Sequence, residues 1–335
     1  MKVLKFGGTS VANTNSIDCI SEIIKNNKNK ITIVVSALGG VTNILSKMLK
    51  KAGKGELNYK NEIGDLEKRH LDIIKDRVHV REQSNVINFV KNQLKTLEDL
   101  LDSIFTLKEI TPKSYSTIIS FGEIISCSIL FEILKGQSID IVYADARELI
   151  ITHNKNNKEI INLVHTQNKV LDFFKKNKNS VTIVAGFISS NNYGEPSTLG
   201  RGGSDYSAAI LANILNADVL EIWTDVSGMY TANPKLVSQA KPISNLSYYE
   251  AMEMSHFGAK VIYPPTLKPI IDKQIPIIIK NTFKPKDKGT LINSNINKSL
   301  QVVKGISHID NVALVTLEGS GMIGVPGFSN RLFKA

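Results

Sequence analysis

Two glycine-rich segments hold the residues best suited to chemistry in this sequence. The first, LKFGGTS at residues 4–10, places Lys5 just before two glycines at the end of a short apolar run. Glycines there let the backbone approach a ligand closely, and the N–H groups of a following helix attract anions. The second, TLGRGGSDYSAA at residues 198–209, holds Arg201 among three glycines. Because a guanidinium can bind a carboxylate through two parallel hydrogen bonds, the two segments together favour a site for anionic ligands.

Other readings of these and further motifs remain open. Ser204 and Asp205 precede an apolar helical pattern, where Ser and Asp are favourable N-caps, so capping alone explains them without a ligand. A third segment, WTDVSGMYTANP at residues 223–234, ends a strand-like run in Thr224 and Asp225. It could hold a nucleoside and its phosphates, although Asp-x-x-Gly is also common in turns.

Several other classes of protein find no support. None of the six histidines has a second ligand at metal-binding spacing, and no GxSxG motif is present, so we expect neither a protein-held metal nor a serine hydrolase. The net charge is +10, but the lysines are scattered and not interleaved with aromatics, so we expect no nucleic-acid partner. No run of about 18 apolar residues predicts a membrane span. The sequence has only two cysteines, and its N-terminus, MKVLKFGG, reaches glycine too early to form the apolar core of a signal peptide. We therefore expect a cytoplasmic location.

Strands and helices alternate around these motifs. An apolar run at 2–6, a helical pattern at 15–26 and a β-branched run at 30–37 form a βαβ unit. The fold class is therefore α/β, with a mainly parallel central sheet and helices on both faces. The sequence predicts further strands at 139–144, 181–188, 218–225 and 275–279, and helices at 120–135, 160–176, 206–216, 248–256 and briefly after Pro265.

Three stretches depart from this alternation. Residues 57–110 carry apolar stripes at helical spacing and predict a helical hairpin laid against the sheet. The polar stretch 152–159 is expected to be a connection. The tail predicts a strand at 312–319, a glycine turn at 320–328 and the start of a helix at 329–335. Because such a module lacks a complete face to bury, we interpret the chain as the front part of something longer or as a shortened natural form.

Taken together, the motifs resemble the aspartate kinase family of the amino-acid kinase fold. The matching segments, in family order and at the usual separations, are KFGGTS at 5–10, GRGGSD at 200–205, WTDVSGMYT at 223–231 and FGAK at 257–260. The sequences of these motifs are most similar to those of the kinase half of the bifunctional aspartokinase/homoserine dehydrogenase type. The resemblance implies a catalytic domain at 1–300, with an N-lobe at about 1–180 and a nucleotide lobe at about 181–300. Residues 301–335 would begin a truncated, ACT-like regulatory region.

The resemblance also implies an activity and its participants. ATP with Mg²⁺ would phosphorylate the side-chain carboxylate of L-aspartate to 4-phospho-L-aspartate, the first step towards lysine, threonine and methionine. Lys5 would bridge the transferring phosphoryl group, and Asp205 would position Lys5 and the reacting carboxylate. Glu123 would bind the substrate ammonium and Arg201 its α-carboxylate. The chain is expected to form a homodimer.

The remaining implied roles are those of binding residues. The full substrate-binding set is Thr42, Glu123, Arg201, Gly202, Gly203 and Ser204. The nucleotide-binding set is Lys5, Phe6, Gly7, Gly8, Ser36, Thr224, Asp225, Tyr230, Lys235 and Lys260.

Two positions differ from the family pattern. The usual Asp-Pro-Arg is Asn233-Pro234-Lys235 here, which replaces a forked guanidinium by an ammonium at an expected phosphate contact. The usual His-Pro is Tyr263-Pro264. Two alternatives to an aspartate kinase remain: a kinase of the same fold for another small acid, such as acetylglutamate or carbamate, and a catalytically silent binding or regulatory polypeptide.

Overall fold

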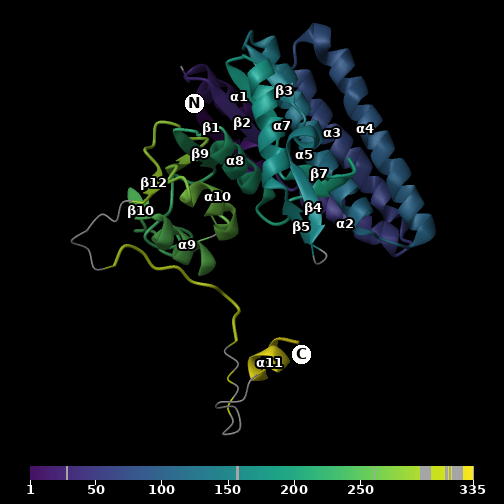
Figure 1. The fold of residues 1–335 in the computed structure, drawn as a ribbon. Helices are drawn as coiled ribbons and strands as arrows, with labels where there is room; N and C mark the ends of the chain where they lie inside the picture. Colours follow the sequence, from purple (N-terminus) through teal and green to yellow (C-terminus); the bar gives the residue numbers. More distant parts are fainter. Residues whose placement is uncertain are drawn as a thin grey trace.

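A long, mainly parallel sheet forms the centre of the protein (Figure 1). The computed structural model describes residues 1–27, 29–155, 158–259, 261–294, 303–313, 316, 318 and 327–334. In these residues the sheet has eight strands, in the spatial order β10 (Asn245–Ser247), β12 (Thr290–Asn293), β11 (Ile277–Asn281), β9 (Val219–Thr224), β1 (Lys2–Phe6), β2 (Ile31–Val35), β6 (Val181–Ala185) and β3 (Ile141–Ala144). All neighbours are parallel except β11 and β12, which confirms the predicted sheet.

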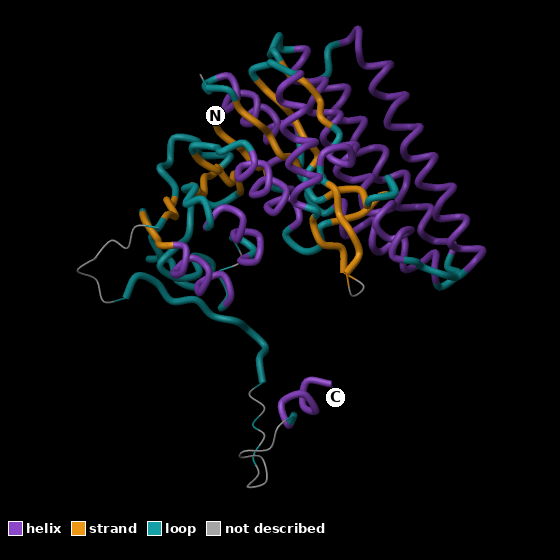
Figure 2. The backbone as a smooth tube through the Cα atoms, in the orientation of Figure 1, coloured by secondary structure: helices purple, strands orange, loops and turns teal. Residues whose placement is uncertain are grey.

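Helices cover this sheet, as Figure 2 shows in purple. Every residue of β2 and β6 is buried, and because successive side chains point to opposite faces, both faces must be covered. The α-helices of the described chain are α1 (Thr14–Lys25), α2 (Val41–Gly53), α3 (Lys60–Arg77), α4 (Val80–Leu107), α5 (Pro112–Gly136), α6 (Ala146–Leu149), α7 (Leu163–Lys176), α8 (Gly203–Ile214), α9 (Tyr248–His256), α10 (Lys268–Ile271) and α11 (Phe328–Lys334). Short 3₁₀ turns are η1 (Gly8–Val11), η2 (Leu57–Tyr59) and η3 (Pro264–Leu267).

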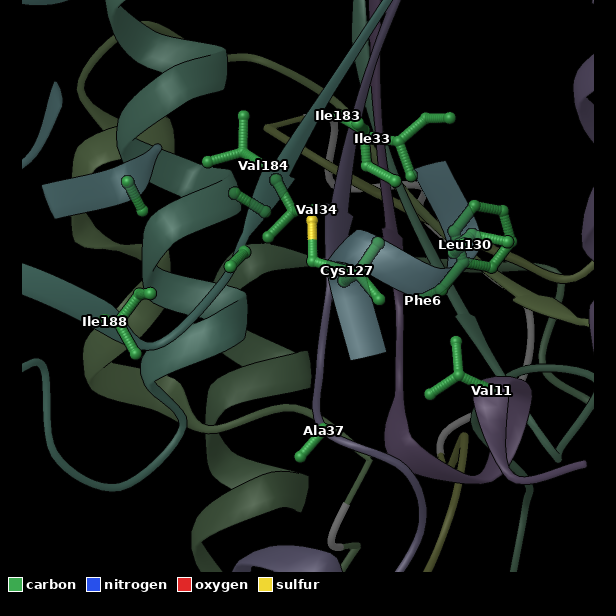
Figure 3. Packing of buried hydrophobic residues seen from close by; sticks show 14 of the residues in the cluster. Phe6, Val11, Ile33, Val34, Ala37, Cys127, Leu130, Ile183, Val184 and Ile188 are labelled. Atoms are coloured by element: carbon green, nitrogen blue, oxygen red, sulfur yellow. The ribbon is translucent and has the colours of Figure 1, made fainter. Parts of the chain in front are cut away.

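One continuous hydrophobic core joins the sheet to its helices. Figure 3 shows side chains of β1, β2, α5 and β6 within this cluster, including Phe6, Val34, Cys127 and Val184. Helix α5 packs against β2, β3 and β6, and α8 packs against β1, β2 and β9. The strands that carry the motifs are therefore held rigidly from their flanks.

Helix α5 is the most deeply buried helix around the site. Thr111 forms a capping box with Ser114, and Pro112 at the first position fixes the start of the helix. Its apolar window has the length and the mean hydropathy, 1.8, of a membrane span, but 78% of that window is buried inside the protein. We interpret α5 as a core helix, and it carries Glu123 near its middle.

A second sheet corrects two predictions. The stretch 152–159, expected to be a connection, forms most of an antiparallel hairpin between β4 (Ile151–Lys155) and β5 (Lys158–Ile161). The single strand expected at 181–188 is divided: β6 ends at Ala185, Phe187 takes a left-handed conformation with φ of 69°, and β7 (Ile188–Asn191) enters the second sheet. There β7 pairs with β4 and with β8 (Pro196–Thr198), which leads directly into the Arg201 loop.

Several other elements lie where the sequence predicts them, whereas α2, α6, β10 and β12 were not predicted. The region 57–110 contains α3 and α4, which pack against each other. Helix α11 coincides with the helix expected at 329–335. Much of the predicted strand at 312–319 and nearly all of the glycine turn at 320–328 lie outside the described residues. The lobe boundaries and the ACT-like character of 301–335 stay predictions.

Candidate active site

The carboxyl ends of β1, β2 and β9 meet at one edge of the main sheet. The register pairs Phe6 of β1 with Val35 of β2 and Trp223 of β9, so the three strands end side by side. A cavity of about 540 Å³ opens at this edge. It gathers ten residues that the sequence predicts for the site, namely Lys5, Gly8, Ser36, Thr42, Glu123, Arg201, Gly202, Gly203, Ser204 and Asp205.

An ion pair lies at the centre of this cavity. The Lys5 Nζ atom is 2.8 Å from Oδ1 of Asp205, and each side chain is 13% exposed. Lys5 comes from the end of β1, whereas Asp205 lies in the first turn of α8, so the pair joins the two glycine-rich segments. This contact places the predicted catalytic residues together and leaves the ammonium close to the open cavity.

Two helix N-termini also face the cavity. Helix α2 is preceded by Gly40 and α8 by Gly202, and neither glycine can supply a side-chain cap. The N-cap of α8 is therefore Gly202, so the alternative reading of Ser204 and Asp205 as caps is wrong. At Gly202, φ is +71°, and a Cβ atom would lie 2.6 Å from Cβ of Tyr263, so only glycine fits. Val41 and Gly203 donate their N–H groups to backbone carbonyls, and the N–H groups that follow them in both first turns make this end of the cavity attractive to anions.

Glu123 brings an isolated carboxyl group to the same cavity. Its side chain is 3% exposed, and its Oε2 has no hydrogen-bond partner among the described residues. Burial raises the pKa of Glu123 to about 8, although the Ala37 N–H and the Lys5 charge act in the opposite direction. A cation that enters the cavity would satisfy this carboxylate and lower its pKa.

Arg201 stands at the rim of the cavity. Its guanidinium carbon lies 5.6 Å from the centre of the Tyr263 ring, which is within the range of a cation–π contact. Tyr263 comes from the turn before η3, and η3 packs against α8. The aromatic ring therefore supports the guanidinium while the charged end remains exposed to a ligand.

A second cavity, of about 350 Å³, begins at the end of β9. Four predicted nucleotide-binding residues line it, namely Thr224, Asp225, Tyr230 and Lys235. Met254 and Val261 add apolar surface, which suits a flat base. Lys260, also predicted for this site, lies outside the described residues.

The structure corrects or refines three predicted nucleotide contacts. The side chain of Phe6 is fully buried and its ring centre lies 6.1 Å from that of Trp223, so only the backbone of Phe6 is left to contact a nucleotide. The N–H of Gly7 donates to the Trp223 carbonyl at 3.1 Å, so it is already engaged. Gly8, which begins η1, keeps its place on the cavity. Ser36 lies in the first cavity, beside Lys5, and not in the second.

Several lining residues escaped the motif reading. Asn43, Tyr115 and Phe187 line the first cavity, and 306–308 line the second. Asn43 could have been found, because it follows the predicted Thr42 in the first turn of a helix. Tyr115 and 306–308 carry no local signal, since only the folded chain brings them to the cavities.

The described residues include no group of three or more His, Cys, Asp or Glu side chains that could hold a metal ion. This arrangement fits Mg²⁺, which is usually bound through substrate phosphates and one or two carboxylates. Asp205 and Asp225, one on each cavity, are the carboxylates that could contact it.

Comparison with known proteins identifies the family. Residues 1–281 match the amino acid kinase family. Over 99% of its length the chain is 34% identical to bifunctional aspartokinase/homoserine dehydrogenase 1 of Arabidopsis thaliana, of which it spans 37%. It is 32% identical to lysine-sensitive aspartokinase 3 of Escherichia coli and covers 72% of that protein. The chain therefore belongs to the amino acid kinase family, and the resemblance to aspartokinases is confirmed.

Solved structures agree with this assignment. Aspartokinase III of E. coli in complex with aspartate and ADP superimposes with a TM-score of 0.82 at 30% identity, over 89% of this chain and 65% of that one. Aspartate kinase of Clostridium acetobutylicum gives a TM-score of 0.75 at 28% identity, over 92% and 66% of the two chains. These neighbours confirm the predicted α/β fold.

Proposed function

We propose that this chain transfers the terminal phosphoryl group of ATP to the side-chain carboxylate of L-aspartate and forms 4-phospho-L-aspartate. The observation that carries the proposal is the first cavity, where the Lys5–Asp205 ion pair, a buried Glu123 and the Arg201 guanidinium face one space. A neighbouring cavity at the next strand end has the apolar and polar lining that a nucleotide needs.

The substrate roles follow from charge. An α-amino acid has an ammonium and a carboxylate on one carbon, and aspartate has a second carboxylate that must reach the phosphoryl group. Glu123 is the buried anion that would bind the ammonium, and Arg201 is the exposed forked cation that would bind the α-carboxylate. The first turns of α2 and α8, with Thr42 and Ser204, would orient the reacting carboxylate.

The reaction itself needs positioning and neutralisation of charge. A carboxylate oxygen attacks the γ-phosphorus, a new O–P bond forms, the bond to the β–γ bridging oxygen breaks, and ADP leaves with the electron pair. No proton has to be moved. Two unit charges ~4 Å apart repel by about 4 kcal/mol at an effective dielectric near 20, so a cation between them is essential. Lys5 is placed for this role, and Asp205 holds its ammonium in position.

Mg²⁺ would accompany the nucleotide. When bound, it neutralises phosphate charge and lets the anionic acceptor approach. We further propose a homodimer and a cytoplasmic location. The first rests on the family resemblance, and the second is consistent with the unpaired cysteines, Cys19 and Cys127. Light scattering of the purified chain tests the dimer.

Aspartyl hydroxamate formation tests the activity. The purified chain, ATP, Mg²⁺ and hydroxylamine are incubated with L-aspartate, N-acetylglutamate or carbamate, and ADP release is followed in parallel. Aspartate-dependent product is expected, and a Lys5→Ala variant serves as the inactive control. Product with one of the other acids alone would assign a different small-acid kinase. ADP binding without any product would favour the silent binding polypeptide.

A further inference from the structure

The chain returns to the nucleotide cavity after the last strand of the main sheet. Residues 303–310, which we name the strap, run beside α9 in an extended path (Figure 1). The strap lies beyond residue 281, where the match to the amino acid kinase family ends. It belongs to none of the four motifs that identify the nucleotide site.

Specific contacts attach the strap to the nucleotide half of the protein. The N–H of Ile306 donates to the carbonyl of Thr231 at 2.8 Å. The Lys304 ammonium lies 2.7 Å from a carboxylate oxygen of Glu250 in α9, and both side chains are partly buried, at 20% and 32% exposure. These two bonds fix the strap on either side of Gly305.

The fit between the strap and the loop after α9 depends on glycine. Gly258 has φ of +120°, and a Cβ atom there would collide with the carbonyl oxygen of His308. Gly305 packs closely too, since a Cβ would lie 3.0 Å from Cε of Met254. The backbones are therefore in direct contact, which a segment passing at a distance would not require.

The strap also forms part of the cavity wall. The second cavity is lined by Ile306, Ser307 and His308. They share it with Thr224 and Asp225, which are distant in the sequence. Ser307 and His308 add a hydroxyl, an imidazole and backbone polar groups to a cavity that Met254 and Val261 make partly apolar. These are the groups that recognise the polar edge of a purine base or the hydroxyls of a ribose.

We propose that the strap is a binding element for ATP and ADP, so that nucleotide affinity depends on residues beyond the family-matched region. The inference rests on the proposed function, because it takes the second cavity to be the nucleotide site. It assigns nucleoside contacts to 306–308 and a tethering role to Lys304 and Gly258.

Calorimetric titration of the 335-residue chain with ADP tests the proposal. Lys304→Met, which keeps the apolar stem but removes the charge, should weaken ADP binding by about twofold to fivefold, as expected for a partly exposed ion pair. Gly258→Ala should weaken it by more than about tenfold, because the strap must leave its place. Val312→Ala is the matched control, since that side chain lies beyond the strap and is 72% exposed, and it should leave ADP affinity unchanged.

Aspartate affinity, titrated separately, shows whether a variant has lost nucleotide binding alone. It should remain within twofold in Lys304→Met and Gly258→Ala, because a general loss of structure would weaken it as well. ADP affinity unchanged in Lys304→Met and Gly258→Ala, with both proteins folded by circular dichroism, would overturn the proposal. If Gly258→Ala fails to fold, Lys304→Met decides alone.

The wild-type protein separates this proposal from the proposed function. If it binds ADP but forms no aspartyl hydroxamate, the aspartate kinase activity is refuted and the proposed role of the strap is not. Wild-type protein that binds no ADP would refute both.

Discussion

Replacing Glu123 by Gln should stabilise the protein and weaken its affinity for aspartate. The folded protein holds a proton on Glu123 up to about pH 8, whereas the ordinary pKa is 4.5, so the unfolded chain releases that proton much earlier. Folding stability therefore falls as the pH rises between these two values. At about 1.36 kcal/mol per pH unit, the loss is about 3 kcal/mol at pH 7 and about 5 kcal/mol above pH 8. A Gln side chain avoids this loss, since it carries no proton to release.

Urea unfolding at several pH values measures the effect. The variant should match the wild type near pH 4.5 and exceed its free energy of unfolding by about 3 kcal/mol at pH 7. Glu132→Gln is the matched control on the same helix, because Glu132 is partly exposed and pairs with Lys135 at the surface. It should leave stability unchanged within about 0.5 kcal/mol. Equal free energies of unfolding for Glu123→Gln and the wild type at pH 7 would refute the claim that burial of Glu123 destabilises the folded protein at that pH.

The same variant separates stability from function. Glu123 as a carboxylate would bind the substrate ammonium, whereas Gln offers only a neutral amide. Aspartate affinity should fall by about tenfold to a hundredfold, the loss expected for a charged hydrogen bond. In the wild type, affinity should improve as the pH rises towards 8, because less free energy is then needed to remove the Glu123 proton. Normal aspartate affinity in Glu123→Gln would exclude Glu123 from the substrate site.

Three further substitutions test the remaining roles. Lys5→Ala should lower kcat by about 10²–10³, as for the loss of one preorganised donor, and near-normal turnover would exclude Lys5 from phosphoryl transfer. Tyr263→Ala should raise KM for aspartate about twofold to fivefold, because it removes the ring next to Arg201. Tyr263→Phe, which keeps the ring, should leave KM unchanged. Equal KM values in both variants would show that the ring does not orient Arg201. Lys235→Arg should lower KM for ATP about threefold to tenfold, because a guanidinium binds phosphate through two hydrogen bonds, and an unchanged KM would place Lys235 away from the phosphates.

The sequence predicts the central strands of the main sheet well because strands such as β2 and β6 are buried on both faces, whereas the partly exposed β10 and β12 escaped prediction. Continuous β-branched runs such as ITIVV in β2 have no competing interpretation in an α/β chain. The second sheet escaped prediction because its strands are short and partly polar. Lys155 and Lys158 pair across a hairpin that composition alone describes as a connection. The division of 181–188 depends on a left-handed Phe187, a conformation that the residue type does not favour.

The structure brings predicted site residues together where a motif places a side chain at a strand end or in the first turn of a helix. Lys5 and Asp205 meet because β1 and α8 each follow this rule. The side chain of Phe6 lies in the core because alternation along the strand turns it away from its neighbour Lys5, so a nucleotide contact of Phe6 stays a prediction for its backbone alone. The strap could not be predicted, because its place on the cavity is a tertiary contact between segments with no common motif.

The order of the strands explains why the N-terminal strand carries the central cation. From β1 the chain moves to β2 on one side, and only much later to β9 on the other. The order therefore reverses at β1, and in open α/β sheets ligands bind outside the carboxyl ends of the strands at such a reversal. The cavity we assign to the amino acid lies towards β2, and the one we assign to the nucleotide begins at β9. β1 lies between β2 and β9, so we infer that Lys5, which lines the first cavity at the carboxyl end of β1, would contact both the amino acid and the terminal phosphate of the nucleotide.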